Sequence, residues 1–322
     1  MKEKKYVNDR YPHFLHGADY NPEQWIDDEG ILDEDMRLMK LANCNEMSVG
    51  IFSWAKLEPQ EGKYDFFFMD EIIDRIGKNG GKIVLATPSG ARPRWLAEKY
   101  PEVLRVNEDG VRMHFNGRHN HCYTSLIYRE KVAKINGLLA KRYGDNKNVL
   151  VWHISNEYGG RCYCNLCQEA FRRYLRKRYD NDIKKLNYAY WSNFWSHSYD
   201  SFEQIEAPTP LTDTDLHGLN LDWKRFCSHQ TLDFMRVEIN AIRQYNKDIP
   251  VTTNMIPAFE FVNYNEFLDD IDVVSYDSYP DWHNESGIRV AMQTAFWHDY
   301  FRALKDKPFM LMESAPGLVN WK

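Results

Sequence analysis

The sequence predicts an α/β protein built as a (β/α)8 TIM barrel that is truncated after its seventh strand. Short apolar segments alternate with stretches of helical periodicity along the 322 residues, which is typical of parallel strands covered by helices. No Gly-x-Gly-x-x-Gly turn follows the first predicted strand, and this disfavours a dinucleotide-binding sheet. Residues 314–322 are too few for an eighth strand and helix. We therefore expect one barrel domain over residues 1–322 that lacks its last strand-helix unit.

Seven strands are predicted, most of them short runs rich in apolar or β-branched residues. They cover residues 13–20, 46–52, 82–87, 149–157, 249–254, 271–276 and 308–313. Helices are predicted where apolar side chains recur at helical spacing, at residues 29–41, 65–77, 128–143, 219–245 and 287–304. Two long irregular segments, 89–125 and 158–215, interrupt the pattern. Loops of that length in compact domains are usually functional or carry short elements of their own, and a basic amphipathic helix is expected near residues 166–178.

The charge balance and the lack of long apolar segments disfavour nucleic acids and membranes as partners. The chain has 41 basic and 47 acidic residues and a net charge of −6, so it offers no general attraction to nucleic acid or to an anionic membrane. No segment approaches the roughly 18 consecutive apolar residues of a membrane span. The first residues are charged and no apolar run follows them, which argues against a secretory signal. We expect a cytoplasmic protein.

Two glutamates stand at the ends of predicted strands. Glu157 ends the fourth strand and Glu313 ends the seventh, and the ends of barrel strands meet at the mouth where TIM-barrel enzymes keep their chemistry. A single such glutamate is as often a cap or an ion-pair partner, but a pair facing across the mouth is typical of retaining glycosidases. Glu157 would be the acid/base and Glu313 the nucleophile. Asn156 is placed to hydrogen-bond a sugar 2-hydroxyl.

The chain resembles a known family at these positions and at three longer motifs. Asn156, Glu157 and Glu313 resemble clan A glycoside hydrolases. The motifs GADYNPEQW at 17–25, FSWAKLEP at 52–59 and EGKYDF at 61–66 resemble family 42 β-galactosidases. The resemblance implies a retaining, exo-acting enzyme that removes terminal β-linked galactose from a galactoside substrate, with Glu157 as acid/base and Glu313 as nucleophile.

The same resemblance implies further site residues. Arg118 and Asn156 match positions that bind galactose hydroxyls, and Trp321 matches an aromatic platform. Tyr276 and Tyr279 fall where a tyrosine contacts the nucleophile, and the sequence does not decide between them. Family members continue into an eighth strand, a domain that helps to build a homotrimer, and a β-sandwich, all absent from these residues. The full-length family is thus expected to be trimeric.

A cysteine cluster predicts a metal site. Cys162, Cys164 and Cys167 lie on one tight loop, and Cys122 in the other long segment can supply a fourth thiolate. Four thiolates suit a closed, structural Zn²⁺ site without an open position for substrate. Free thiols are the alternative interpretation, and His119 and His121 are competing ligands. The resemblance implies a zinc site of this type and favours Cys122.

Two other functions remain open from the sequence. The two glutamates alone do not choose galactose, so a clan A β-glycosidase of other sugar specificity is one alternative. A truncated barrel with two unpaired strand edges could instead be an inactive carbohydrate-binding fragment. Hydrolysis of β-galactosides, β-glucosides and α-galactosides would separate the three.

Overall fold

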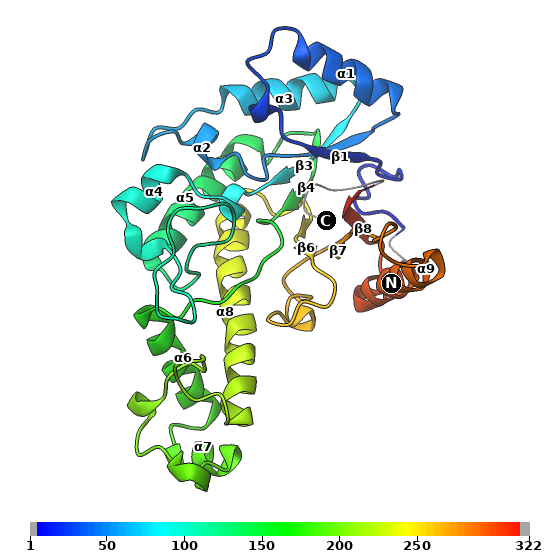
Figure 1. The fold of residues 1–322 in the computed structure, drawn as a ribbon. Helices are drawn as coiled ribbons and strands as arrows, with labels where there is room; N and C mark the ends of the chain where they lie inside the picture. Colours follow the sequence, from blue (N-terminus) through cyan, green and yellow to red (C-terminus); the bar gives the residue numbers. More distant parts are fainter. Residues whose placement is uncertain (1–4, 316–322) are drawn as a thin grey trace.

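The strands of the chain form two adjoining parallel sheets in the computed structural model, which describes residues 5–315 (Figure 1). The first sheet has the order β1-β2-β3-β4-β5 and the second the order β6-β7-β8, with every neighbouring pair parallel. The strands are β1 (Gly17–Tyr20), β2 (Glu46–Val49), β3 (Lys82–Ala86), β4 (Val149–His153), β5 (Val251–Thr252), β6 (Asn254–Met255), β7 (Ser275–Ser278) and β8 (Met310–Ser314).

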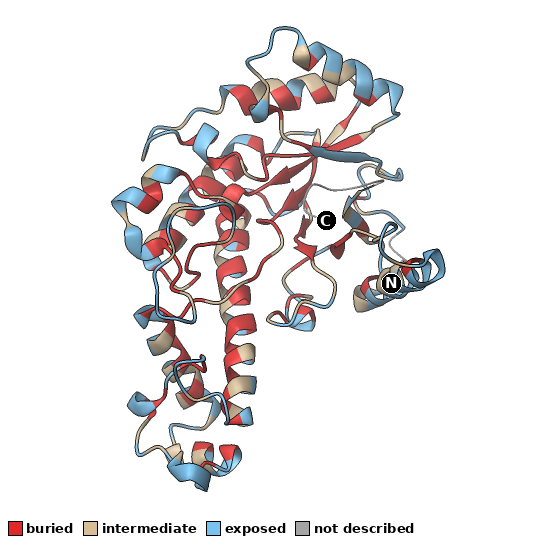
Figure 2. Ribbon diagram, in the orientation of Figure 1, coloured by how far each residue is buried: buried red, intermediate tan, exposed pale blue. Residues whose placement is uncertain are grey.

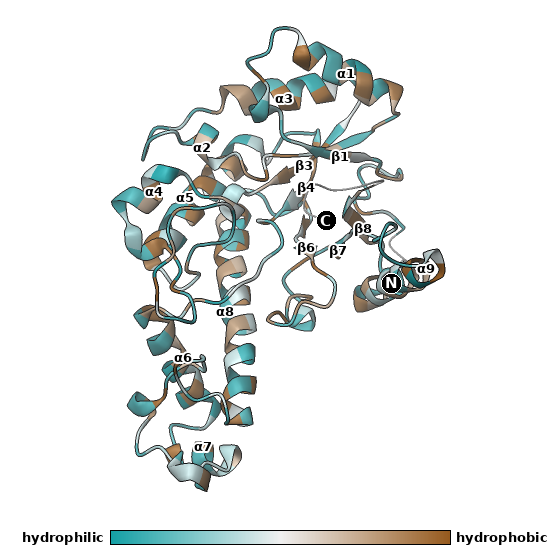
Figure 3. Cartoon of the chain, viewed as in Figure 1, coloured by the Kyte–Doolittle hydropathy of each residue, from teal (hydrophilic) through white to brown (hydrophobic). Residues whose placement is uncertain are grey.

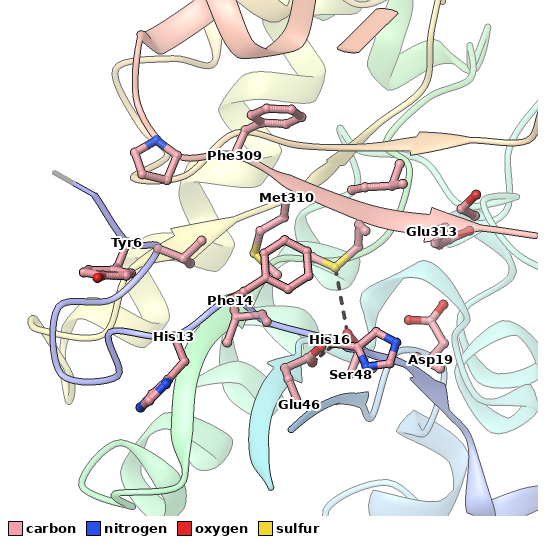
Figure 4. Close-up of a pocket in the computed structure, with 18 of the residues that line it drawn as sticks. Tyr6, His13, Phe14, His16, Asp19, Glu46, Ser48, Phe309, Met310 and Glu313 are labelled. Atoms are coloured by element: carbon pink, nitrogen blue, oxygen red, sulfur yellow. Dashed lines mark hydrogen bonds between the residues drawn. The ribbon is translucent and has the colours of Figure 1, made fainter. Parts of the chain in front are cut away.

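Only Thr253 separates β5 from β6, so these two short strands are halves of one barrel strand. The strands therefore follow one another in chain order around an open barrel, which confirms the predicted alternation of parallel strands and helices. A cleft of about 690 Å³ lies between β1–β2 and β8 (Figure 4). Across it, Ser48 Oγ is 3.8 Å from Met312 Sδ. Within residues 5–315, β1 and β8 have no ladder with each other.

Helices cover the outer side of the strands, and α8 also extends beyond the barrel to contact α6 and α7. In Figure 1, α1 and α3 lie together beside β1, whereas α8 runs past the barrel to reach α6 and α7. Figure 2 shows burial concentrated on β3, β4 and one stripe of α8, whereas most of β1 is exposed. Figure 3 shows many polar residues on the outer helix surfaces, although α9 also exposes Ile288, Met292 and Phe296. The helices are α1 (Ile31–Leu41), α2 (Trp54–Leu57), α3 (Phe67–Lys78), α4 (Arg94–Lys99), α5 (Leu126–Tyr143), α6 (Asn165–Arg178), α7 (Ile183–Tyr190), α8 (His217–Arg243) and α9 (Gly287–Lys305).

Some strand boundaries differ from the prediction because the backbone leaves the ladder. β4 ends at His153, four residues early, since Ser155 and Glu157 have φ angles of 55° and 40°. These left-handed angles do not fit a strand. The segment predicted as a strand from residue 271 forms a ladder only from Ser275. Before that point the Val251 carbonyl accepts two N–H groups, from residues 272 and 273, and regular pairing is lost.

A buried carboxylate on α8 ties the loops after β3 and β4 to the helix layer. Glu238 is fully buried and accepts hydrogen bonds from the Thr87, Ser89 and Tyr158 hydroxyls at 2.6–2.9 Å. The Asn136 amide on α5 donates a fourth at 2.8 Å. Burial raises the pKa of Glu238, while these donors oppose the shift. A buried carboxylate is tolerated because its oxygens are satisfied.

No helix among residues 5–315 combines the length and the apolar character needed to span a bilayer.

Replacing Glu238 by Gln should lower the free energy of unfolding by about 2–4 kcal/mol, because the amide loses charge-assisted hydrogen bonds and faces a donor on Asn136. Urea unfolding measures the change. The matched control is Glu203→Gln, which removes an exposed carboxylate paired with Arg176 and should change stability by less than about 1 kcal/mol. Equal effects of the two substitutions would contradict the role given to Glu238.

Candidate active site

Three carboxyl groups converge where β4, β7 and β8 end. Glu157 follows β4, Asp277 lies in β7 and Glu313 lies in β8. One side-chain oxygen of each residue lies within 4.8 Å of the others. The parallel strands of a barrel bring their carboxyl ends to one rim, so residues far apart in sequence meet there. The two glutamates predicted from strand ends are therefore brought together.

Glu157 is held by its backbone and by a guanidinium. Its φ of 40° is costly for a residue with a side chain, and such strain is stored chiefly at functional sites. Its N–H donates to Asn254 Oδ1 at 2.7 Å, which fixes the turn. Arg118 Nη2 lies 2.7 Å from Glu157 Oε2, with 48% of the Arg118 side chain and 12% of the Glu157 side chain exposed. The ion pair thus stands at the edge of the site.

Glu313 accepts two strong donors. Tyr279 Oη donates to Glu313 Oε2 at 2.5 Å, and Asn254 Nδ2 donates to Oε1 at 2.9 Å. Burial raises the pKa of Glu313, as does the nearby Glu157 carboxylate. The Tyr279 hydroxyl, the Asn254 amide and the Arg118 guanidinium act in the opposite direction, since donors and positive charge favour the ionised form. The net direction is upward, so these donors offset only part of the cost of ionising Glu313 in its half-buried position.

Asn156 lies between the guanidinium and the second glutamate. With the amide turned so that both of its atoms are satisfied, Nδ2 donates to Glu313 Oε1 at 3.0 Å and Oδ1 accepts from Arg118 Nη1 at 2.9 Å. The side chain is fully buried. The structure thus brings Arg118, Asn156, Glu157 and Glu313 into one connected group.

The two tyrosines that the sequence left open have different places. Tyr279 contacts Glu313. Tyr276 is fully buried, its hydroxyl meets His298 Nδ1 on α9, and its ring stacks on Phe301 with centroids 4.2 Å apart. Side chains alternate between the two faces of a strand, so Tyr276 points toward the helix layer when Asp277 points into the barrel. The expectation that Tyr276 binds substrate is corrected on this ground. Trp321 lies outside the described residues.

Two site residues were missed by the sequence interpretation, Asn254 and Asp277. Asn254 Nδ2 donates to Asp277 Oδ2 at 2.8 Å as well as to Glu313, and His153 Nε2 lies 3.0 Å from Asn254 Oδ1. Asp277 is only 2% exposed. The available signal was a carboxylate within a buried strand, on the same face as Tyr279 two residues later.

A further carboxylate borders the site from the first strand. Asp19 on β1 and Glu313 on β8 both line the cleft between these strands (Figure 4). Desolvation in the cleft, together with the Glu313 and Glu157 carboxylates, raises the pKa of Asp19 to about 7. The sequence motif at 17–25 contained this residue, but no reasoning from the strand pattern assigned it a role.

The four predicted cysteine ligands come together away from the carboxylates. Their sulfurs all lie within 4.8 Å of one another, and all four residues are buried and free of disulfides. Cys122 Sγ is 3.6 Å from Cys164 Sγ and 3.4 Å from Cys167 Sγ. A tetrahedral site with Zn–S bonds of ~2.3 Å needs sulfurs about 3.8 Å apart. The residues therefore fit a closed tetrahedral metal site, and neither His119 nor His121 belongs to the cluster among the described residues.

Comparisons with known proteins agree on one family. The family 42 glycoside hydrolase model, described as "Beta-galactosidase", matches residues 19–322. The β-galactosidase GalA of Bacillus licheniformis is 53% identical over 95% of this chain and 47% of its own length. The β-galactosidase Pbg of Clostridium perfringens is 54% identical over the whole chain and 48% of its own length. This chain thus spans about half the length of these relatives.

Solved structures support the same assignment. Gan42B, a GH42 β-galactosidase from G. stearothermophilus, matches with a TM-score of 0.97 and 52% identity over 99% of this chain and 48% of that one. The β-galactosidase from Rahnella sp. R3 matches with a TM-score of 0.97 and 49% identity over 100% of this chain and 47% of that one. Because the family model covers nearly all of the sequence, the chain belongs to glycoside hydrolase family 42.

Proposed function

We propose that the protein is a retaining exo-β-galactosidase in which Glu313 is the nucleophile and Glu157 the acid/base. The observation that carries this proposal is the approach of the Glu157 and Glu313 carboxyl oxygens to within 4.8 Å. Retaining glycosidases keep their two carboxyl groups about 5–5.5 Å apart, whereas inverting enzymes separate them by about 6.5–9.5 Å to admit a water molecule. The short separation leaves room for direct attack by Glu313.

In the first step the ionised Glu313 attacks the anomeric carbon while Glu157 protonates the departing glycosidic oxygen. The Glu313 carboxylate is held in position by two hydrogen bonds, one from Tyr279 to Oε2 and one from Asn254 to Oε1. In the second step Glu157 takes a proton from water, which displaces Glu313 and releases the sugar with retained configuration. Asn156 and Arg118 are placed to hydrogen-bond sugar hydroxyls beside this centre.

The preference for galactose rests on the relatives and not on the carboxylates. Both curated relatives compared above are named β-galactosidases. The contacts of Arg118, Asn156 and Tyr279 with Glu157 or Glu313 support the proposal that these residues bind the sugar. The homotrimer and the cytoplasmic location remain predictions.

We also propose that the cysteine cluster holds a structural Zn²⁺. Cys122, Cys162, Cys164 and Cys167 would supply all four ligands, which leaves no position for substrate. The bound metal would join the loop that carries Arg118 to the loop that follows Glu157. Backbone contacts already begin this junction, since Tyr163 N–H donates to the Val106 carbonyl at 2.9 Å.

Glu313→Gln should lower kcat/KM on p-nitrophenyl β-galactoside by at least about 10³-fold, because the variant lacks the nucleophile. Glu157→Gln should lose about 10²–10⁴-fold on an alkyl β-galactoside such as lactose and much less on an aryl galactoside with a good leaving group. Initial-rate kinetics with β-galactosides, β-glucosides and α-galactosides measure these effects. Activity of Glu313→Gln equal to that of the parent would exclude Glu313 as nucleophile, and preference for the glucoside would exclude galactose specificity.

Cys164→Ser should lower the zinc content per chain and lower the Tm by about 5 °C or more, because the closed site loses a thiolate. Plasma mass spectrometry of the purified protein and a thermal melt measure both. The control is Cys44→Ser, a partly buried cysteine outside the cluster, which should keep the zinc content of the parent. Unchanged zinc in Cys164→Ser would contradict the metal assignment.

A further inference from the structure

The three carboxyl groups of the site are not balanced by positive charge. Glu157, Asp277 and Glu313 approach one another to within 4.8 Å, and Arg118 is the cation that pairs with Glu157. Three ionised carboxylates beside one guanidinium would leave net repulsion in a poorly solvated site, where charges interact more strongly than in water. Protonation of at least one of the three carboxyls would relieve this repulsion.

The hydrogen-bond donors identify which carboxyl is least stabilised as an anion. Glu157 has the Arg118 guanidinium, and Glu313 has the Tyr279 hydroxyl and the Asn254 amide. Within residues 5–315, the donor to Asp277 is the Asn254 amide, whose hydrogen bond Asp277 accepts at Oδ2 and shares with Glu313. Its Oδ1 is buried and receives no N–H or hydroxyl donor from the described residues. A buried carboxylate oxygen without a donor is costly, and protonation removes that cost.

We propose that Asp277 holds a proton in the ligand-free site and passes it to Glu157 when a galactoside binds. This inference rests on the proposed function, because it concerns how Glu157 becomes an acid. The transfer is balanced: the Asp277 carboxyl loses its proton and becomes a carboxylate, while the Glu157 carboxylate gains that proton. Asp277 acts through Glu157 and is a positioning residue for the proton. No other bond forms or breaks in this step.

The ion pair at Glu157 explains why the proton must move. With Arg118 2.7 Å away, Glu157 is stabilised as a carboxylate, which is the wrong form for protonating a leaving group. Sugar hydroxyls that bind Arg118 compete for its N–H donors, and the bound ring excludes water. Both effects weaken the support for the Glu157 anion. A neighbouring carboxyl that already carries a proton can then supply it without access to bulk water.

The electrostatic surroundings of Asp277 agree with this placement. Burial is the largest cause that raises the pKa of Asp277 well above the ordinary value. The Glu313, Glu157 and Asp19 carboxylates and a hydrogen bond with Glu157 raise it further. Two further titratable groups, the hydroxyls of Tyr264 and Tyr279, also face this carboxyl. Asp19 is the rival proton holder, because its pKa is raised to about 7.

The test compares two substrates in Asp277→Asn, which keeps the size of the side chain and an acceptor for Asn254 but cannot carry the transferred proton. Lactose needs protonation of its leaving group, whereas 2,4-dinitrophenyl β-galactoside does not. The variant should lose about 30-fold in kcat/KM on lactose and less than about threefold on the dinitrophenyl substrate. The alkaline limb of its pH profile on lactose should move to lower pH, because Glu157 beside Arg118 must then retain the proton alone.

Both rates are measured on one preparation of the full-length protein, so a reduced amount of folded enzyme cancels in their ratio. An equal loss on both substrates, or an unmoved alkaline limb, would overturn the inference and leave Asp277 with a structural role. The same leaving-group dependence in Asp19→Asn and not in Asp277→Asn would overturn it in favour of Asp19. If the parent cleaves neither galactoside, the proposed function fails instead.

Discussion

The hydrogen bonds of one buried amide hold the candidate active site together. Asn254 lies on β6 and joins β4, β7 and β8 through Glu157 N–H, Asp277 and Glu313. One amide can hydrogen-bond all of these groups only if the ends of β4, β7 and β8 keep fixed distances from one another. The hydrogen bonds of Asn254 therefore depend on the curvature of the barrel at its rim. The Glu157 backbone accepts an unfavourable φ angle in this frame. The geometry of the candidate site therefore depends on a polar contact inside the barrel as well as on apolar packing outside it.

Positive charge is the scarce element of the site. Arg118 is half exposed and carries the ion pair with Glu157, while the other carboxyls rely on neutral donors such as Tyr279 and Asn254. Neutral donors support an anion less than a guanidinium does. The arrangement suits a reaction in which one carboxyl must be ionised and another protonated at the same pH. The four cysteines of the cluster bring together the loop that carries Arg118 and the loop that follows Glu157.

Much of the fold was predictable from the sequence because apolar strands and amphipathic helices leave distinct periodicities. The two candidate catalytic glutamates were found by the same route, since each ends a predicted apolar strand. The contact between Tyr279 and Glu313 was not predictable, because the choice between Tyr276 and Tyr279 depends on which face of β7 is turned inward. Asp277 was missed for a related reason: its meaning comes from Glu157 and Glu313, which lie on other strands. The local sequence pattern predicts where strands form. Contacts between side chains on different strands can be identified only in the assembled barrel.

We propose that Glu313 attacks the sugar and forms a covalent intermediate. The most direct measurement is to incubate the protein with 2,4-dinitrophenyl 2-deoxy-2-fluoro-β-galactoside, whose fluorine slows release of the trapped sugar, and to map the labelled peptide by mass spectrometry. We predict one fluorogalactosyl group per chain, attached to Glu313 in the peptide that contains residues 310–314. A label on Glu157, on Asp277 or on no residue of an enzyme that cleaves galactosides would contradict the account.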